Sequence, residues 1–292
     1  MPSLKDLRNR IDSVKSTKKI TQAMKMVAAS KLKKAQDLAE KSRNYSEGIE
    51  DIVKNLVMSG DYIDHPLMGT AKKTINKALV IVVSSDRGLC GGLNTNIVKN
   101  TRNLISNLEN DNKLISIICI GKKGYDSLSV FNKEYFNHET DFISISDIDY
   151  SHLQNEGNNI IKNFYKGDFD ECYIVYNYFK SVISQEVKIE RLLPYDISNY
   201  ETSKEENNTF FDFEPDEEEV LSKILPKNFI VQIYKSILES RASEQGARMT
   251  AMDNATRNAG EMIDSLSLKY NRQRQAMITK ELIEIISGAE AL

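Results

Sequence analysis

The chain has 292 residues, with 39 Lys and Arg against 42 Asp and Glu, which gives a net charge of −3. This length suits one large or two modest domains, and so small a net charge gives no global attraction to nucleic acid. No apolar run reaches the roughly 18 residues of a membrane span, and no signal peptide opens the sequence. We therefore expect any membrane association to go through a partner.

Residues 3 to about 58 are predicted to form one long helix, about 80 Å in length at 1.5 Å per residue. Its apolar seam is expected to start with Leu4, Leu7, Ile11 and Val14, at coiled-coil spacing. Lys18 and Lys19 interrupt this spacing. After a shift, the seam is expected to resume through Ile20, Met24, Val27, Ala28, Leu32, Ala35, Ala39, Tyr45, Ile49, Ile52 and Leu56.

The first helix is strongly basic. Residues 1–43 hold 12 Lys and Arg against four acids, a net charge of +8. Such a helix can bind nucleic acid or a membrane surface, match an acidic protein partner, or present a solvated face. No aromatic residue precedes Tyr45, which argues against single-stranded nucleic acid. A solvated face or an acidic partner is favoured.

The middle of the chain, about residues 61–200, is predicted to be a Rossmann-like α/β body that follows a loop at 61–74. Apolar, β-branched runs predict buried strands, and helical patterns alternate with them. The predicted strands are residues 78–84, 114–120, 131–136, 172–179 and 186–193. Helices are expected from the turn at 85–92 to about 110, in a short stretch after Gly121, and over 150–165.

A glycine-rich turn, residues 85–92, follows the first predicted strand, where a phosphate could bind. Its order is Gly-x-x-Gly-Gly rather than GxGxxG, and no Walker lysine follows it. Asp86 and Arg87 could pair with each other, or they could cap the helix. We favour a structural turn over a nucleotide site, so no cofactor is expected.

Residues 201–226 are predicted to connect the body to a last long helix. Nine acids against one lysine fall between 201 and 219, with three phenylalanines among them, which indicates a solvated linker or a contact surface. A helical stretch is expected over 216–225, and Pro226 is expected to kink it or to start the long helix anew. The segments are thus 1–60, 61–200, 201–226 and 227–292.

The C-terminal helix is expected within residues 227–292, and 62 residues of helix would run about 93 Å. Ala247, Ala251, Ala255 and Ala259 recur every four residues along it. The row is a ridge of small side chains that lets another backbone approach closely. An ordinary alanine-rich helix is the alternative reading. With the small residues of the first helix, the row predicts an antiparallel coiled coil of the two terminal helices.

The end of this helix is predicted to be an apolar tip. The tip residues are Ile278, Leu282, Ile283, Ile285 and Ile286, and they cover about 160° of the helix at 100° per residue. If both helices start level, the second overhangs by about 8 residues, or 12 Å. An exposed apolar tip needs a sleeve. Arg272, Arg274 and Gln275 lie just below it, within reach of acidic loops on such a sleeve.

No catalytic group of residues stands out. The three histidines, His65, His138 and His152, lack metal-ligand spacing to one another or to a cysteine. The cysteines at 90, 119 and 172 are far apart, which indicates small buried apolar residues in a reducing compartment. A mechanical or scaffolding role is therefore favoured over catalysis.

Four stretches carry a resemblance to a known family. They are KKITQAMKMVAASK at 18–31, SDRGLCGGLN at 85–94, ARMTAMDNAT at 247–256 and NRQRQAMITKELIEIISGA at 271–289. They are long, they stand in order, and the likeness spans the whole chain. The sequence resembles the gamma subunit of the F-type ATP synthase.

The resemblance implies a non-catalytic shaft inside a ring of three alpha and three beta subunits. Its body would contact the epsilon subunit and the membrane c ring, with no nucleic acid partner, and rotation would drive the beta sites through their cycle. The residues implied to contact beta are Arg274, Gln275, Thr279, Glu284, Met24 and Lys25, and Arg248 is implied to pack near Met24. For Lys25, a solvated surface lysine is the equal alternative.

Two further points bear on the family. Plant-plastid relatives insert a regulatory cysteine pair, but residues 190–230 contain no cysteine here, so thiol control is not expected. With no transit peptide, a peripheral position on the cytoplasmic face of a bacterial inner membrane is expected, or the matrix face in a mitochondrion. A basic coiled-coil adaptor for an anionic partner is the alternative, but it does not explain the apolar tip.

Overall fold

A computed structural model of the chain describes residues 3–59, 65–69, 75–136, 142–145, 148–195 and 217–290. The chain divides into two compact units. The helical unit consists of residues 1–30 and 248–292, and the α/β unit consists of residues 31–247. Two terminal helices, α1 (Leu4–Ser59) and α6 (Glu217–Glu290), each contribute residues to both units.

One five-stranded sheet forms the centre of the α/β unit, in the order β3-β2-β1-β4-β5. The strands are β1 (Lys77–Val83), β2 (Leu114–Ile120), β3 (Phe142–Ile143), β4 (Glu171–Phe179) and β5 (Gln185–Leu193). The first four are parallel, and β5 is antiparallel to β4. The remaining elements of the unit are η1 (Pro66–Met68), α2 (Leu93–Asn110), α3 (Lys122–Phe131), η2 (Lys133–Tyr135) and α4 (Tyr150–Lys166).

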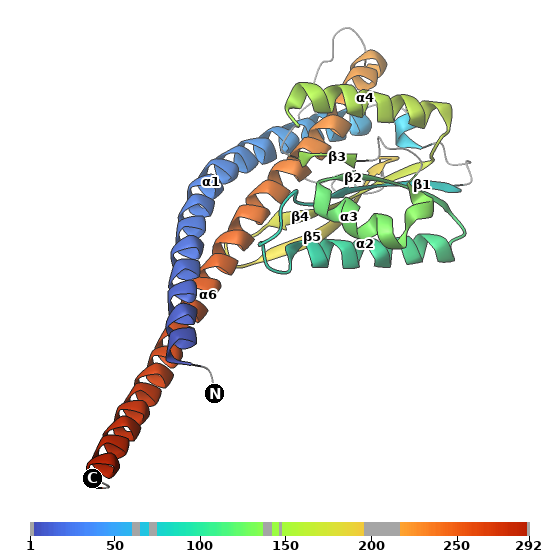
Figure 1. The fold of residues 1–292 in the computed structure, drawn as a ribbon. Coiled ribbons are helices and arrows are strands. Elements are labelled where there is room, and N and C mark those ends of the chain that lie inside the picture. The colour runs from blue at the N-terminus through green and yellow to red at the C-terminus, as the bar shows by residue number, and fades with distance from the viewer. Residues whose placement is uncertain are drawn as a thin grey trace. The chain divides into compact units, whose positions relative to one another are not determined.

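Helices cover both faces of this sheet (Figure 1). Alternate residues of β1 point to opposite faces, so Leu79, Ile81 and Val83 pack with α1, α4 and α6, while Val80 and Val82 pack with α2 and α3. A strand buried on both faces explains the continuous apolar run in the sequence. The predicted α/β body with a mainly parallel sheet is confirmed.

The predicted strand at residues 131–136 is wrong. Phe131 ends α3, and the following residues form the 3-10 turn η2. In this segment the aromatic side chains pack against one another instead of pairing in the sheet. The rings of Phe136 and Tyr125 meet edge-on, with their centres 5.4 Å apart. The strand that pairs with the outer edge of β2 is β3, where Cys119 lies opposite Phe142.

The seam of α1 is continuous, and the predicted shift at Lys18 does not occur. Buried or half-buried side chains alternate at spacings of four and three residues over the whole helix. One row of these side chains comprises residues 4, 7, 11, 14, 18, 21, 25, 28, 32, 35, 39, 42, 46, 49, 53 and 56. This is an unbroken coiled-coil period. Of the predicted seam residues, Ile20, Val27, Tyr45 and Ile52 are instead exposed by 40 to 60%.

The pattern was missed because polar residues occupy several seam positions. Thr21, Ser42 and Ser46 are each less than 9% exposed. Lys18 and Lys25 extend along the neighbouring helix, with the Lys18 ammonium 3.3 Å from where a Cβ on Gly260 would lie. A search for apolar residues alone passes over these positions. The aliphatic part of a lysine side chain can nevertheless be buried in a seam.

Helix α6 begins at Glu217, ten residues before the predicted start of the long helix, and passes through Pro226 without a break. A proline inside a helix costs about 3 kcal/mol, because it frees a carbonyl and crowds the preceding turn. Leu221, Leu225 and Phe229 lie on one face across the proline and are fully buried. The Tyr195 hydroxyl also donates a hydrogen bond to the Leu225 carbonyl at 3.0 Å. These contacts offset the cost.

A buried ion pair joins α1, α6 and β4 within the α/β unit. Arg43 donates to both carboxylate oxygens of Glu239, with an Nη2–Oε2 distance of 2.8 Å, and to the Phe179 carbonyl at 3.0 Å. Glu239 is fully buried and also accepts the Phe179 backbone N–H. The hydrogen bond to Glu239 raises the pKa of Arg43. The Glu239 carboxylate of α6 therefore accepts hydrogen bonds from Arg43 of α1 and from the backbone of β4.

Glu239→Ala should lower the free energy of unfolding by about 3–5 kcal/mol, because it leaves the Arg43 guanidinium without its buried partner. Urea denaturation of the full chain measures this. The control is Glu219→Ala, which removes an exposed pair with Lys223 and should cost less than about 1 kcal/mol. Equal losses in the two variants would contradict the account.

Candidate partner-binding surface

The helical unit is an antiparallel pair made by the start of α1 and the end of α6 (Figure 1). Lys25 Nζ lies 2.6 Å from Asp253 Oδ1, and Thr256 Oγ1 lies 2.7 Å from Thr21 Oγ1. Lys18 faces Gly260. The residue numbers of each facing pair total 277 or 278, so the register is fixed at three successive turns.

The same register places Leu4 opposite Arg274. Residues 275–290 of α6 therefore have no facing residue of α1, which leaves about 24 Å of single helix at 1.5 Å per residue. The predicted overhang of 12 Å is too short, because it assumed that the two helices start level. Every described side chain from Arg274 to Ala289 is exposed.

The overhanging helix presents the predicted tip to solvent. The exposed fractions are 45% for Ile278, 53% for Leu282, 58% for Ile283, 67% for Ile285 and 56% for Ile286. A continuous apolar surface of this kind is uncommon on a soluble monomer and marks a contact with another protein or a membrane. Within the described ranges, no helix combines the length and apolarity needed to cross a bilayer.

The predicted contact residues of the tip lie on this same stretch of α6. Arg274, Gln275, Thr279 and Glu284 are all exposed. The Thr279 hydroxyl donates to the Gln275 carbonyl at 2.9 Å, and Glu284 lies 3.6 Å from Lys280 one turn away. Both contacts stay within the helix. The polar ends of these side chains remain available to a partner.

The second predicted contact, at Met24 and Lys25, lies on the paired part of the unit, so the structure does not bring it together with the tip residues. Both side chains are half-buried. The hydrogen bond from Lys25 lowers the pKa of Asp253, so this contact is lost as the pH falls through that lowered value. Sequence reasoning missed Asp253, because only the register shows that it faces Lys25.

Exposed apolar residues flank this second contact. Ile20 and Val27 are 60% and 56% exposed, and their spacing places them on one face of α1. They lie outside the seam, so their exposure is not explained by packing between the two helices. The register puts Arg248 opposite Ser30, and its packing near Met24 stays a prediction.

The alanine row of α6 faces α1 in part. Ala259 is 7% exposed, and Ala251 and Ala255 are half-buried. Ala247 is 8% exposed, but it packs with Cys90 and Leu93 instead. Ala28, at the corresponding part of the α1 seam, is 1% exposed. Small side chains on both helices allow close backbone approach, which fits the ridge interpretation.

The glycine-rich turn belongs to the α/β unit and is held by its own side chains. Leu89 and Gly91 adopt positive φ angles of 65° and 61°. Asn94 Nδ2 donates to Ser85 Oγ at 2.8 Å, which closes the turn at the start of α2. Buried Cys90 packs with Leu93 and Ala247. The turn therefore has a clear structural role.

Asp86 lies in this turn, but its hydrogen-bond partners belong to α3 and to the residues just after β3. Its carboxylate accepts the Lys122 N–H at the start of α3 at 3.1 Å, the Ser144 hydroxyl at 2.9 Å and the Ile145 N–H at 3.3 Å. Asp86 does cap a helix, as one of the two alternatives predicted, but the helix is α3 and not α2. A phosphate at the start of α3 would have to displace a carboxylate from donors that it already satisfies.

Other chemical groups have structural surroundings. All three cysteines are free and buried, and burial raises the pKa of Cys172. His65 caps η1 by accepting the Leu67 N–H, and His138 lies outside the described residues. Among the residues that the structure describes, no His, Cys, Asp and Glu side chains gather as a metal site would require.

Comparison with known proteins decides the family. A family model described as ATP synthase matches residues 3–292. The ATP synthase gamma chain of Pelagibacter ubique is 50% identical over 295 residues, with 100% of both chains covered. That of Rhodospirillum rubrum is 49% identical over 301 residues, again covering 100% of both. The chain belongs to the ATP synthase gamma chain family.

Solved structures agree with this assignment. The central stalk of the Tetrahymena thermophila mitochondrial ATP synthase matches with a TM-score of 0.62 and 26% identity, covering 81% of this chain and 99% of that one. The rotor of the Euglena gracilis mitochondrial enzyme matches with a TM-score of 0.64 and 18% identity, covering 94% and 98%. At 18% identity, the Euglena structure supports only the fold. The resemblance stated from the sequence is confirmed.

In this gamma chain, Ala28→Leu should destabilise the helical unit by about 1–3 kcal/mol, because a larger side chain forces the paired backbones apart. Hydrogen exchange of the amides at residues 18–30 measures the local effect. Ala23→Leu is the matched control, because Ala23 is exposed on the same helix. Similar exchange in both variants would show that the seam tolerates larger residues.

Proposed function

We propose that this chain is the central rotor shaft of an ATP synthase that carries torque between a membrane c ring and the catalytic beta subunits. The observation that carries the proposal is the single helix beyond Arg274, whose exposed Ile and Leu side chains need a surrounding apolar surface. A sleeve formed by three alpha and three beta subunits would supply that surface. The c ring and an epsilon subunit would contact the α/β unit.

The shaft acts by differential contact. A partner changes conformation only if its states interact with the shaft to different extents. The helical unit has an apolar tip, a charged contact at Lys25 and Asp253, and the exposed residues Ile20 and Val27 on a single face of α1. These features make its sides unequal. Rotation would present different sides to each beta subunit in turn.

The contact residues divide into two zones. The tip zone comprises Arg274, Gln275, Thr279 and Glu284, with the apolar tip beside them. The lower zone comprises Met24 and Lys25. Guanidinium and amide groups can hydrogen-bond acidic or polar loops. The apolar tip offers no directional hydrogen bonds, so it can turn within its sleeve without favouring one orientation. Both zones are proposed to face beta subunits.

The chain is a subunit of the ATP synthase complex, and we infer that it contributes no catalytic group of its own. The donors around Asp86 are satisfied from within the fold, which supports this inference. We further propose that it lies at the cytoplasmic face of a bacterial inner membrane, or at the matrix face in a mitochondrion, held there by its partners.

The first test is purification of a tagged chain from the membranes of its host, with measurement of subunit stoichiometry. One copy for each three alpha and three beta subunits is expected, and ATPase activity coupled to proton pumping should be lost when the chain is depleted. Recovery of the chain alone, or with nucleic acid, would overturn the proposal and favour an adaptor.

Met24→Lys should lower the number of protons pumped per ATP hydrolysed while leaving assembly intact. The substitution adds a second positive charge next to Lys25 at a half-buried position, so it changes the charge pattern presented to a partner. Gln22→Lys is the matched control, because Gln22 is exposed two residues away. Unchanged pumping in Met24→Lys would contradict a coupling role for this zone.

Ile285→Glu should impair coupled ATPase activity more than removal of residues 288–292. A carboxylate placed in an apolar sleeve carries a desolvation cost, whereas truncation only shortens a long contact. Ile285→Met serves as the control that keeps the apolar character. If truncation and Ile285→Glu have the same effect, the tip is not held in an apolar sleeve.

A further inference from the structure

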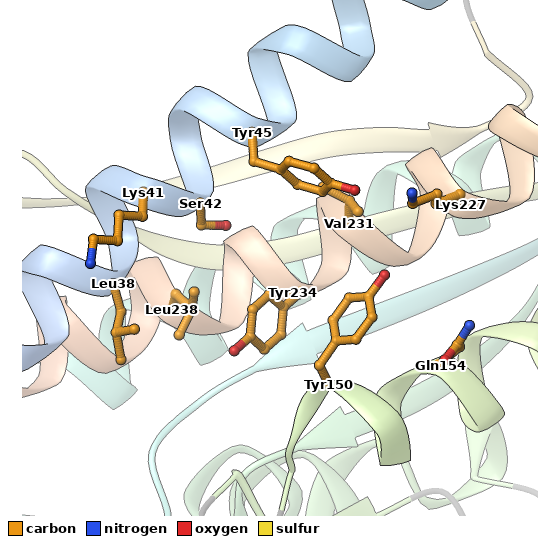
Figure 2. Close-up of a pocket in the computed structure, with 10 residues that line it drawn as sticks. All are labelled: Leu38, Lys41, Ser42, Tyr45, Tyr150, Gln154, Lys227, Val231, Tyr234 and Leu238. Carbon is orange, nitrogen blue, oxygen red and sulfur yellow. The ribbon is translucent and has the colours of Figure 1, made fainter.

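A cavity of about 540 Å³ lies in the α/β unit where α1, α4 and α6 meet (Figure 2). Its size falls in the range of small-molecule sites, roughly 300–1,000 Å³. All of its lining residues belong to the α/β unit. It is separate from the contact zones proposed above, so it requires another explanation.

The floor of the cavity is apolar, and its walls are aromatic. Val231 and Leu238 of α6 are 2% and 3% exposed. The rings of Tyr150 and Tyr234 meet edge-on at 5.4 Å, and Tyr45 lies on the side formed by α1. Aromatic walls favour a planar ring system, because rings pack well edge-to-face and offset against one another.

The charges that line the cavity are both positive. Lys41 and Lys227 lie at opposite ends of it, and the lining includes no carboxylate (Figure 2). The Lys227 ammonium lies 5.8 Å from the centre of the Tyr45 ring, and a hydrogen bond with the Tyr45 hydroxyl raises the pKa of Lys227. Two cations without a carboxylate in the lining attract an anion.

We propose that this cavity binds a small aromatic acid. Its acidic group is held by the Lys227 ammonium and the nearby hydroxyls of Tyr45 and Tyr150. Its ring system lies on Val231 and Leu238, beside Tyr234. Charge-assisted hydrogen bonds fix the acidic end, and burial of the rings supplies most of the remaining affinity.

Such a ligand would touch three helices at once and would resist their separation. Any molecule that binds only the folded state stabilises it. The site is distinct from the two zones proposed to face beta subunits, because its residues belong to the α/β unit. Failure of the binding test would leave the rotor proposal unchanged.

The test uses the full chain and two fluorescent probes. 8-Anilinonaphthalene-1-sulfonate carries one sulfonate, and N-phenyl-1-naphthylamine is its neutral counterpart. We expect the sulfonate to bind more tightly, with one strong site, and Lys227→Gln to weaken it about tenfold. Lys223→Gln is the control, because Lys223 is an exposed lysine one turn earlier on α6 and should leave the affinity unchanged.

A second pair of variants separates binding from folding. Gln154 is exposed on α4 at the same end of the cavity as Lys227 (Figure 2), so Gln154→Glu and Gln154→Ala should fold alike. Gln154→Glu should abolish strong binding of the sulfonate through repulsion, and Gln154→Ala should retain most of it. Equal binding by this pair, or equal weakening by Lys223→Gln and Lys227→Gln, would overturn the proposal.

A competition experiment tests whether the apolar part of the ligand is aromatic or aliphatic. 1-Naphthoate should displace the probe at a lower concentration than decanoate, because only the naphthoate carries rings that pack against the tyrosines. More effective displacement by decanoate would overturn the assignment to an aromatic acid.

Discussion

The structure depends on how closely two helices from opposite ends of the chain can approach each other. Close approach requires small residues where the two backbones are nearest, and apolar residues outside the seam stay exposed. Ala28 and Ala259 are buried where the helices meet, while Ile20 and Val27 remain in solvent. The same constraint therefore builds the helical unit and leaves its outer surface apolar. A shaft that turns within a sleeve requires both properties.

The α/β unit meets a different demand, because it has to hold the two helices firmly. Residues 228–244 of α6 are buried on almost every side, as expected for a helix enclosed by a sheet and other helices. Buried polar side chains are paired in this region, as Glu239 is with Arg43 and the backbone of β4. Directional bonds of this kind fix one orientation, which apolar packing alone does not do.

Much of this fold could be predicted from the sequence, and the failures have physical causes. The buried strands and both long helices follow from apolar period, and the tip follows from its isoleucines. The seam near Lys18 was misplaced, because lysine and threonine fill positions that a search for apolar residues ignores. The strand predicted at Phe131 was wrong because aromatic residues favour strands and ring packing alike. The overhang and the role of Asp253 depend on register, which no local pattern encodes. The cavity beside Tyr150 depends on three helices distant in sequence.

The Asp86 carboxylate gives the α/β unit a fixed internal anion. Folds of this class commonly bind phosphate groups from solution with backbone N–H groups at the start of a helix. Here the negative charge is part of the chain, so the donors are satisfied at every ratio of ATP to ADP. The start of α3 therefore does not depend on the supply of nucleotide for its hydrogen bonds, which suits a part whose role is to transmit force.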